Sequence, residues 1–188
     1  LPVYAFLFVP MRISIAGDPK RFLERASKIQ AGLLICVYCL SYAPALLYLD
    51  EAGGLTYSDK SRLLFLLVTL SMLGEAVQFG WSRLYGKHVI APEINQSRTW
   101  EGFLGSSATI GLVGAALFPL GATPFAELWQ AAVASLAIAV MGFAGAMTLS
   151  AVKRDRRVQD YGTLAEGQAG VLDRADALCF AAPVFYHL

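Results

Sequence analysis

The sequence has little charge and few of the residues that build soluble metal sites or disulfide-stapled domains. Only 15% of its 188 residues are charged, against 56% that are hydrophobic, and the formal net charge is +1. Soluble domains carry about 25% charge. Two histidines and three cysteines give little support to a histidine metal centre or a secreted disulfide scaffold. The near-neutral balance argues against a nucleic-acid partner, and the apolar content argues against disorder.

The sequence has instead six apolar stretches separated by five polar loops, and we predict a membrane span in each. The predicted spans are Leu1–Val9, Ala31–Leu49, Leu63–Gly80, Phe103–Leu120, Ala131–Leu149 and Ala177–Leu188. The middle four are close to the 20 or so residues that a helix needs to cross about 30 Å of hydrocarbon. They lack the period-two alternation of barrel strands. The predicted fold is therefore an all-α, polytopic integral membrane helix bundle, with residues 1–188 forming one membrane domain. Because the first span opens without a methionine and the outer two spans are short, we expect further chain beyond them.

The charged residues alternate between the two sides of these spans. Every Lys, every Arg and every acid except Glu75 falls in a loop, and the first, third and fifth loops (10–30, 81–102 and 150–176) hold thirteen of the fifteen basic residues. Lys60 and Arg62 are the other two. This is a positive-inside pattern. It places loops one, three and five on the cytoplasmic side of the membrane, so any chemistry on them uses cytoplasmic substrates.

Two local features bear on the spans. Asp18-Pro19 before an apolar stripe from Phe22 to Ile29 predicts a helix start, either leading directly into the second span or lying along the membrane surface. The lead-in is the simpler geometry. Gly and Ala are dense in the fourth and fifth spans, and such small residues let helix backbones approach closely.

Loop five carries the residues with the clearest chemical meaning. Asp173 and Asp176 are three apart, so on a helix both carboxylates project from one face. Mg²⁺ typically uses one or two carboxylates and leaves its other positions to substrate phosphates. Lys153 and Arg154 can supply positive charge to a phosphate. The alternative is that these basic residues are ordinary interfacial charges that anchor the neighbouring spans.

Loops three and five together resemble the phosphatidate cytidylyltransferases, also called CDP-diacylglycerol synthases. The matching blocks are Gly86-Lys87-His88 with Ala91-Pro92, Arg98-Thr99-Trp100-Glu101-Gly102, Ser150-x-x-Lys153-Arg154, and Gly167-x-x-Gly170-x-x-Asp173-Arg174-x-Asp176. The resemblance covers about the last 115 residues. It divides the membrane domain into N-terminal spans and loops (1–62) and a cytidylyltransferase-like catalytic part (63–188).

The resemblance implies a membrane enzyme of phospholipid biosynthesis that transfers CMP from CTP to phosphatidate, releasing diphosphate and CDP-diacylglycerol under Mg²⁺. The implied partners are CTP, phosphatidate or a similar lipid phosphate, and membrane lipids; a second cation and a homodimer are left open. We predict Asp173, Asp176, Asp160 and Lys153 as catalytic residues, with Asp173, Asp176 and Glu75 as metal ligands. The predicted substrate-binding residues are Ser150, Arg154, Arg174, Gly167, Gly170, Lys87 and Arg98.

Several positions differ from the family pattern, among them Glu75 and the Asn95–Arg98 stretch, and three of the differences motivate a second hypothesis. The family's acid four residues before the loop-five serine is Ala146 here, its Lys-Asp pair reads Gln159-Asp160, and its glycine-rich turn contains Gln168. These differences fit a catalytically impaired paralogue that acts as a membrane lipid-phosphate- or nucleotide-binding subunit. A third hypothesis is a small transporter. Transporters carry ionisable groups near the middle of the membrane, and in this sequence only Glu75 comes near that description.

The position of Glu75 bears on the hypothesis that the protein is a membrane cytidylyltransferase. It is eight residues before Arg83, and Ala146 is seven before Lys153, so each lies about 10–12 Å inward along its helix. An acid at that depth is costly, and so we expect Glu75 to have a bound cation or a basic loop residue as its partner.

Overall fold

A long N-terminal helical arm leads into the helices that form the core. In this computed structural model the described residues are 2–15, 21–49, 56–121, 123–156, 163–165, 168–169 and 175–188. Helix α1 (Pro2–Ile15) packs against α2 (Phe22–Leu33), which continues through the π-helical η1 (Leu34–Cys39), α3 (Leu40–Ala45) and the 3-10 turn η2 (Leu46–Tyr48). The predicted lead-in to the second span is thereby confirmed, since one helix runs from Phe22 to Tyr48. Asp18 and Pro19 lie outside the described residues.

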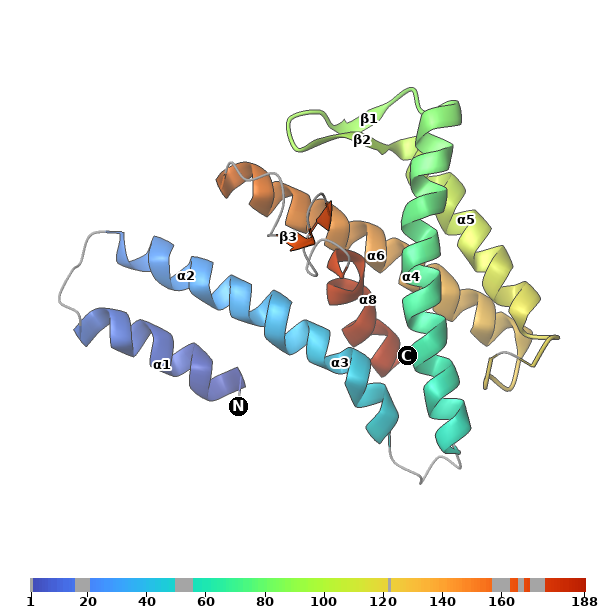
Figure 1. The fold of residues 1–188 in the computed structure, drawn as a ribbon, viewed down its shortest axis with the longest axis horizontal. Coiled ribbons are helices and arrows are strands. Elements are labelled where there is room, and N and C mark those ends of the chain that lie inside the picture. The colour runs from blue at the N-terminus through green and yellow to red at the C-terminus, as the bar shows by residue number, and fades with distance from the viewer. Residues whose placement is uncertain are drawn as a thin grey trace.

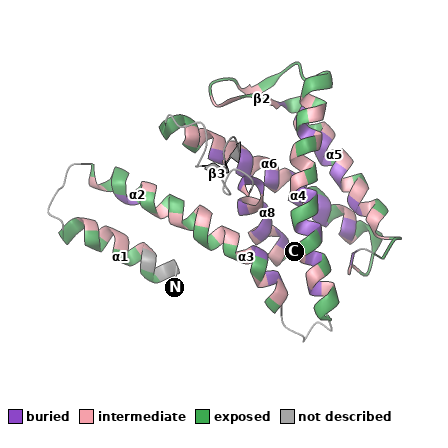
Figure 2. Ribbon diagram, viewed as in Figure 1, coloured by how far each residue is buried: buried purple, intermediate pink, exposed green. Residues whose placement is uncertain are grey.

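Four further helices pack together to form the core. These are α4 (Tyr57–Tyr85), α5 (Trp100–Leu117), α6 (Leu128–Arg156) and α8 (Asp176–His187). In Figure 1, α4 and α5 run side by side, α6 crosses behind them and α8 lies between α6 and α3. Figure 2 shows buried residues concentrated where these helices face one another, while α1 and α2 are largely exposed or half-buried. The buried core is therefore formed mainly by the helices that follow the arm in the chain.

The predicted helical membrane bundle is confirmed, with helices at the six predicted positions. Among the described residues, three are long and apolar enough to cross a membrane: Phe22–Tyr48, α4 and α6. Helices α1, α5 and α8 are shorter or less apolar. Helix α5 begins with Trp100 and Glu101 and contains several glycines and serines, which lower its hydropathy.

The ends of the long helices extend beyond the predicted spans. Helix α4 has 29 residues, about 44 Å at 1.5 Å per residue. It begins where the Thr56 backbone N–H donates to Asp59 at 3.2 Å, as part of a reciprocal capping box that satisfies donors otherwise left free at a helix start. Because the hydrocarbon layer is only about 30 Å thick, the polar turns of α4 can reach past it.

Small residues allow the core helices to approach closely, as the sequence predicts. A Cβ added at Gly145 of α6 would come within 2.6 Å of the Asp176 backbone oxygen, and one at Gly114 of α5 would overlap Ser135 of α6. Leucine and isoleucine side chains fill the rest of the interface, among them Leu67, Leu70 and Ile138. The contact at Gly145 matters for the site because it places the start of α8 directly against α6.

Two short sheets interrupt the helical pattern, both in loops that the sequence predicts to be cytoplasmic. β1 (Val89–Ala91) pairs antiparallel with β2 (Asn95–Thr99), and β3 (Thr163–Ala165) pairs antiparallel with β4 (Gln168–Ala169). The β1–β2 hairpin stands at the C-terminal end of α4 (Figure 1). The sequence predicts only loops here, because these strands are too short to show a clear alternation.

Candidate active site

Loops three and five meet at the C-terminal ends of α4 and α6. The Asn95 side-chain amide donates to the Ser150 hydroxyl at 3.3 Å, and Arg154 Nε donates to the Ile94 backbone oxygen at 3.0 Å. The predicted substrate-binding residues Ser150 and Arg154 therefore also hold the β1–β2 hairpin against α6. Loop three and the Ser150–Arg154 part of loop five therefore lie against each other, even though Asn95 and Ser150 are 55 positions apart in the chain.

A chain of hydrogen bonds ties β2 to α4 and α5. The Gly102 N–H donates to Thr99 Oγ1 at 3.1 Å, which caps α5. The Thr99 hydroxyl donates to Ser82 Oγ at 2.9 Å, and Gln78 Nε2 donates to the same oxygen at 2.8 Å. Thr99 and Gln78 are both buried, and buried hydrogen-bonded networks of this kind fix a unique geometry. They set the position of Arg98, the residue before Thr99.

Arg98 is directed into the bundle. Its side chain is only 13% exposed, and its Nη2 lies 3.8 Å from Glu75 Oε1. Its Nη1 donates to Gln78 Oε1 at 2.7 Å, and the guanidinium carbon lies 5.7 Å from the centre of the Phe143 ring, within the range of a cation–π contact. Arg98 thus supplies the basic partner predicted for Glu75, and it comes from loop three.

Two acids from distant parts of the chain stand side by side next to Arg98. Asp176 opens α8, is buried, and accepts a hydrogen bond from the Ala177 N–H at 2.8 Å. Its carboxyl group lies within hydrogen-bonding reach of the Glu75 carboxyl group. The positive charge of Lys153 also acts on the Glu75 carboxyl group. Like charges this close need a proton or a cation between them. Glu75 and Asp176, two of the three predicted metal ligands, therefore lie close together, and their role as ligands stays a prediction.

A small cavity opens against Glu75 and Arg98. It has about 10 Å³ of room for the centre of a water-sized sphere, enough for about one water molecule. It is lined by residues of α4, β2, α5 and α6: Ser71, Gly74, Glu75, Gln78, Arg98, Ser106, Ile138, Ala139, Gly142 and Phe143. Among the described residues, neither Glu75 Oε1 nor Ser71 Oγ has a hydrogen-bond partner, although both atoms are buried. Two oxygen atoms in the site are therefore left for another ligand.

The donor set fits a hard divalent cation. Carboxylate and hydroxyl oxygens are the ligands that Mg²⁺ takes, and it commonly uses only one or two protein carboxylates. Within the ranges that the structure describes, no group of three or more His, Cys, Asp or Glu residues could hold a metal. The predicted residues Asp160, Gly167, Gly170, Asp173 and Arg174 lie outside the described residues, as does Gln159. Their roles stay predictions.

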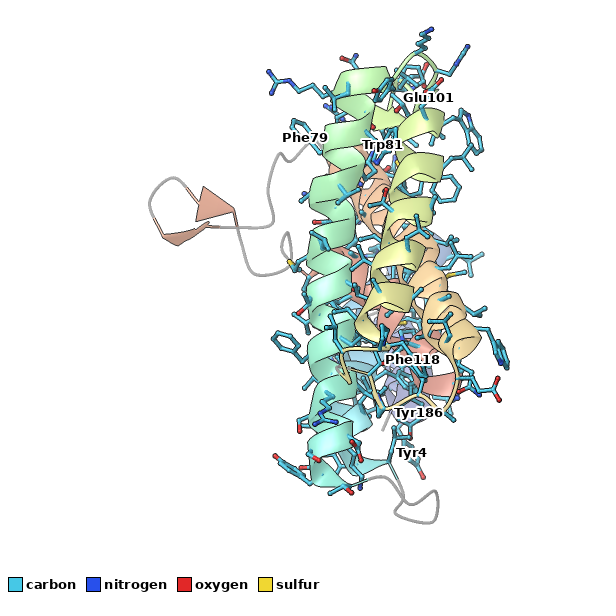
Figure 3. All side chains as sticks on the ribbon, turned by 90° about the vertical axis from the view of Figure 1, so that its right-hand side faces the viewer. Tyr4, Phe79, Trp81, Glu101, Phe118 and Tyr186 are labelled. Atoms are coloured by element: carbon cyan, nitrogen blue, oxygen red, sulfur yellow. The ribbon has the colours of Figure 1, made fainter. Side chains whose placement is uncertain are left out.

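Lys87 and its neighbours form a second polar cluster at the base of the hairpin. The backbone N–H groups of Lys87 and His88 each donate to Glu101 Oε2 at 3.2 Å, and His88 Nδ1 lies 2.6 Å from Glu101 Oε1. Together with the backbone N–H of Glu101 itself, these bonds lower the pKa of Glu101 to about 2, the His88 contact contributing most. Figure 3 shows Glu101 at one end of the bundle, with Phe118 and Tyr186 toward the other. The Lys87 side chain is exposed.

Two residues of these networks are absent from the sequence predictions. Gln78 lies three residues after Glu75, so the two share a helix face, and a glutamine within an apolar span is itself a signal. Glu101 is part of the loop-three motif, but nothing in the sequence shows that it binds the backbone at Lys87 and His88. Ala146, the family's acid position, is fully buried next to the close contact between Gly145 and α8.

The sequence of this chain is similar to those of several known proteins. The chain is 35% identical over 187 residues to the uncharacterised protein YnbB of Escherichia coli, covering 100% of this chain and 61% of that protein. It is 30% identical over 177 residues to a phosphatidate cytidylyltransferase of Mycobacterium leprae, covering 92% of this chain and 53% of the relative. A Staphylococcus saprophyticus phosphatidate cytidylyltransferase is 33% identical over 142 residues, covering 73% and 50%. The chain thus spans roughly half to three-fifths of the length of these relatives.

The family model named "Cytidylyltransferase family" matches residues 2–188. The match includes the N-terminal arm, which lies outside the motifs that carry the resemblance in the sequence. The chain is therefore a divergent member of the cytidylyltransferase family.

Proposed function

We propose that this chain transfers CMP from CTP to phosphatidate, giving CDP-diacylglycerol and diphosphate at the cytoplasmic face of a bacterial inner membrane. The observation that carries the proposal is the pairing of Glu75 with Asp176 beside Arg98, with Glu75 Oε1 lacking a hydrogen-bond partner. The pair lies below loops three and five, where a nucleotide from the cytoplasm and a lipid headgroup can both arrive. The phosphatidate cytidylyltransferase relatives support the same reaction.

The reaction is a displacement at phosphorus. A phosphate oxygen of phosphatidate forms a bond to the α-phosphorus of CTP, and the bond from that phosphorus to the oxygen bridging to the β-phosphate breaks, so that diphosphate leaves. Such a step needs in-line alignment and neutralisation of charge more than a protein nucleophile. A bound divalent cation supplies charge neutralisation on the phosphate oxygens.

The residues of the chain take distinct parts in this scheme. Glu75 and Asp176 would hold the cation, together with the predicted ligand Asp173 and the predicted supporting acid Asp160. Lys153, near the end of α6, and Arg154 at the hairpin would bind phosphate. Arg174, Lys87, Arg98, Ser150 and the Gly167–Gly170 turn complete the proposed substrate contacts.

Radiolabelled CTP offers a direct test. Purified protein in phospholipid nanodiscs, supplied with CTP, phosphatidate and Mg²⁺, is expected to form a labelled CDP-lipid and one diphosphate per lipid. Omitting phosphatidate is the control, because hydrolysis of CTP alone would release diphosphate or phosphate without a labelled lipid. Absence of the CDP-lipid from protein that is folded and monodisperse contradicts the proposal.

The burial of Ala146 favours one alternative, a subunit that binds the substrates but does not turn them over. Ala146 occupies the position of a family acid and has no exposed surface. For such a subunit, the native sequence would bind CTP without forming product, and Ala146→Asp would create or greatly increase CDP-lipid formation. Under the main proposal the native protein is already active, and this substitution, which places a charge in a packed interface, lowers its stability.

A further inference from the structure

Arg98 is hydrogen-bonded to Gln78 and forms only a long ion pair with Glu75. Arg98 Nη1 is 2.7 Å from Gln78 Oε1, a normal hydrogen bond, whereas Nη2 is 3.8 Å from Glu75 Oε1, beyond hydrogen-bonding distance. A guanidinium next to a carboxylate normally forms charge-assisted bonds of about 2.7–2.9 Å, often two in parallel. Here a neutral amide oxygen takes the place of the carboxylate, and the facing Glu75 oxygen has no hydrogen-bond partner among the described residues.

The amide of Gln78 is itself fixed in orientation. Its Nε2 donates to Ser82 Oγ at 2.8 Å, so its oxygen is the atom that faces Arg98. The reversed amide would place two donors, NH₂ and guanidinium, against each other. Gln78 is only 3% exposed, and the Phe143 ring lies against the guanidinium. The separation of Arg98 from Glu75 is therefore built into the packing of α4, β2 and α6.

We propose that Gln78 is a positioning residue that holds the Arg98 guanidinium away from Glu75, keeping the Glu75 carboxylate open to a divalent cation. Without the Gln78 oxygen, the nearest acceptor for Arg98 is Glu75 Oε1, and a shift of about 1 Å would close an ion pair of ordinary length. That ion pair would compete with the cation for the same oxygen. The inference rests on the proposed function only in identifying the cation as the one used in CMP transfer.

A double-mutant cycle tests this inference through cation binding rather than activity. Mn²⁺ serves as the probe, because its free concentration can be followed by electron paramagnetic resonance with the full chain in nanodiscs. Gln78→Leu is expected to weaken Mn²⁺ binding about tenfold or more, and Arg98→Gln is expected not to weaken it. The double variant should bind Mn²⁺ as Arg98→Gln does, because Gln78 acts only through Arg98. Gln30→Leu, the same change in α2, is the matched control and should bind as the unmodified protein does.

Several results would overturn the inference. Unchanged Mn²⁺ affinity in Gln78→Leu shows that Arg98 does not close on Glu75. A double variant as weak as Gln78→Leu shows that Gln78 acts independently of Arg98 or that its loss damages the fold. If the unmodified protein forms CDP-lipid and the Gln78→Leu variant keeps full Mn²⁺ affinity, only this inference is refuted. If the unmodified protein binds Mn²⁺ but forms no CDP-lipid, the proposed function is refuted and the mutant cycle can still be interpreted. If the unmodified protein binds no Mn²⁺, the inference itself is refuted.

Discussion

The buried side chains of α4 are mostly leucines in its N-terminal half, with Lys60 as a charged exception, and mostly polar in its C-terminal half. In the N-terminal half, Leu63, Leu66, Leu67 and Leu70 are buried against apolar residues of α3, α5, α6 and α8. In the C-terminal half, the inward positions carry polar groups that bind one another and the β1–β2 hairpin. Apolar packing needs only shape, whereas each buried polar group needs a specific partner. The first half therefore stabilises the bundle, and the second half specifies a site.

The strongest way to break this contrast is to remove an acid from the polar half. Asp176→Asn keeps the size of the side chain and its hydrogen bond to the Ala177 N–H, but removes a negative charge from the proposed cation site. We expect CDP-lipid formation to fall more than about 100-fold, since even residues that only support metal ligands cost 10–100-fold. The measurement is product formation in nanodiscs at saturating CTP and Mg²⁺.

Arg156→Ala is the control for Asp176→Asn. Arg156 is exposed and its Nε lies 3.7 Å from Asp155 at the end of α6, so its loss should change the rate little. Equal losses from both variants would mean that the fifth loop fails as a whole, and would contradict a specific role for the acid.

In the apolar half, Leu67→Ala should give the opposite signature. Leu67 is completely buried, and truncation of such a residue costs about 2–5 kcal/mol of stability through lost burial and a new cavity. The melting temperature in detergent should fall clearly, while turnover per folded molecule at low temperature stays near that of the unmodified protein. Phe65→Ala removes a side chain that is 72% exposed and should lower the melting temperature much less. A large loss of turnover from Leu67→Ala would show that the halves are not separable.

The junction between β2 and α5 tests the polar network with a smaller effect. Thr99→Val removes the hydroxyl that caps α5 and donates to Ser82. Loss of an N-cap costs about 1 kcal/mol, and we expect a modest fall in both melting temperature and turnover as Arg98 becomes less well fixed. Thr148→Val is the control, because its hydroxyl bonds only to the Ala144 backbone oxygen within α6. If both variants melt alike, the cap does not position β2.

The smallest expected effect is the pH dependence that Glu101 adds at the base of the hairpin. Its pKa is lowered from an ordinary value of 4.5 to about 2 by His88 and the neighbouring backbone N–H groups. A depressed pKa in the folded state stabilises the protein above the unfolded value, and this contribution is lost as the pH falls through the folded value. The difference in melting temperature between the unmodified protein and Glu101→Gln should therefore be constant just above pH 4.5. It should shrink between pH 4.5 and about 2.

Glu93→Gln provides the comparison for Glu101, because Glu93 is an exposed acid in the turn of the same hairpin. We expect the difference in melting temperature between the unmodified protein and Glu93→Gln to stay nearly constant between pH 4.5 and about 2. A pH-independent difference for Glu101→Gln would contradict the role of the ionised carboxylate.

The sequence by itself determined the membrane-helix architecture and the end of the bundle that carries the motifs. Apolar length is enough to predict helices, since a chain in lipid must satisfy its backbone within each segment. The alternation of basic residues is enough to group loops three and five on one side. Glu75 could be singled out because an acid inside an apolar span is costly.

Only the tertiary structure decided which side chains meet. The close contact at Gly145 brings Asp176 to Glu75, and the hydrogen bonds of Thr99 turn Arg98 inward toward Gln78. These residues are far apart in the chain, and helical periodicity relates only neighbours three or four positions apart. Their geometry depends on how α4, α6 and α8 pack, and that packing is a property of the whole bundle.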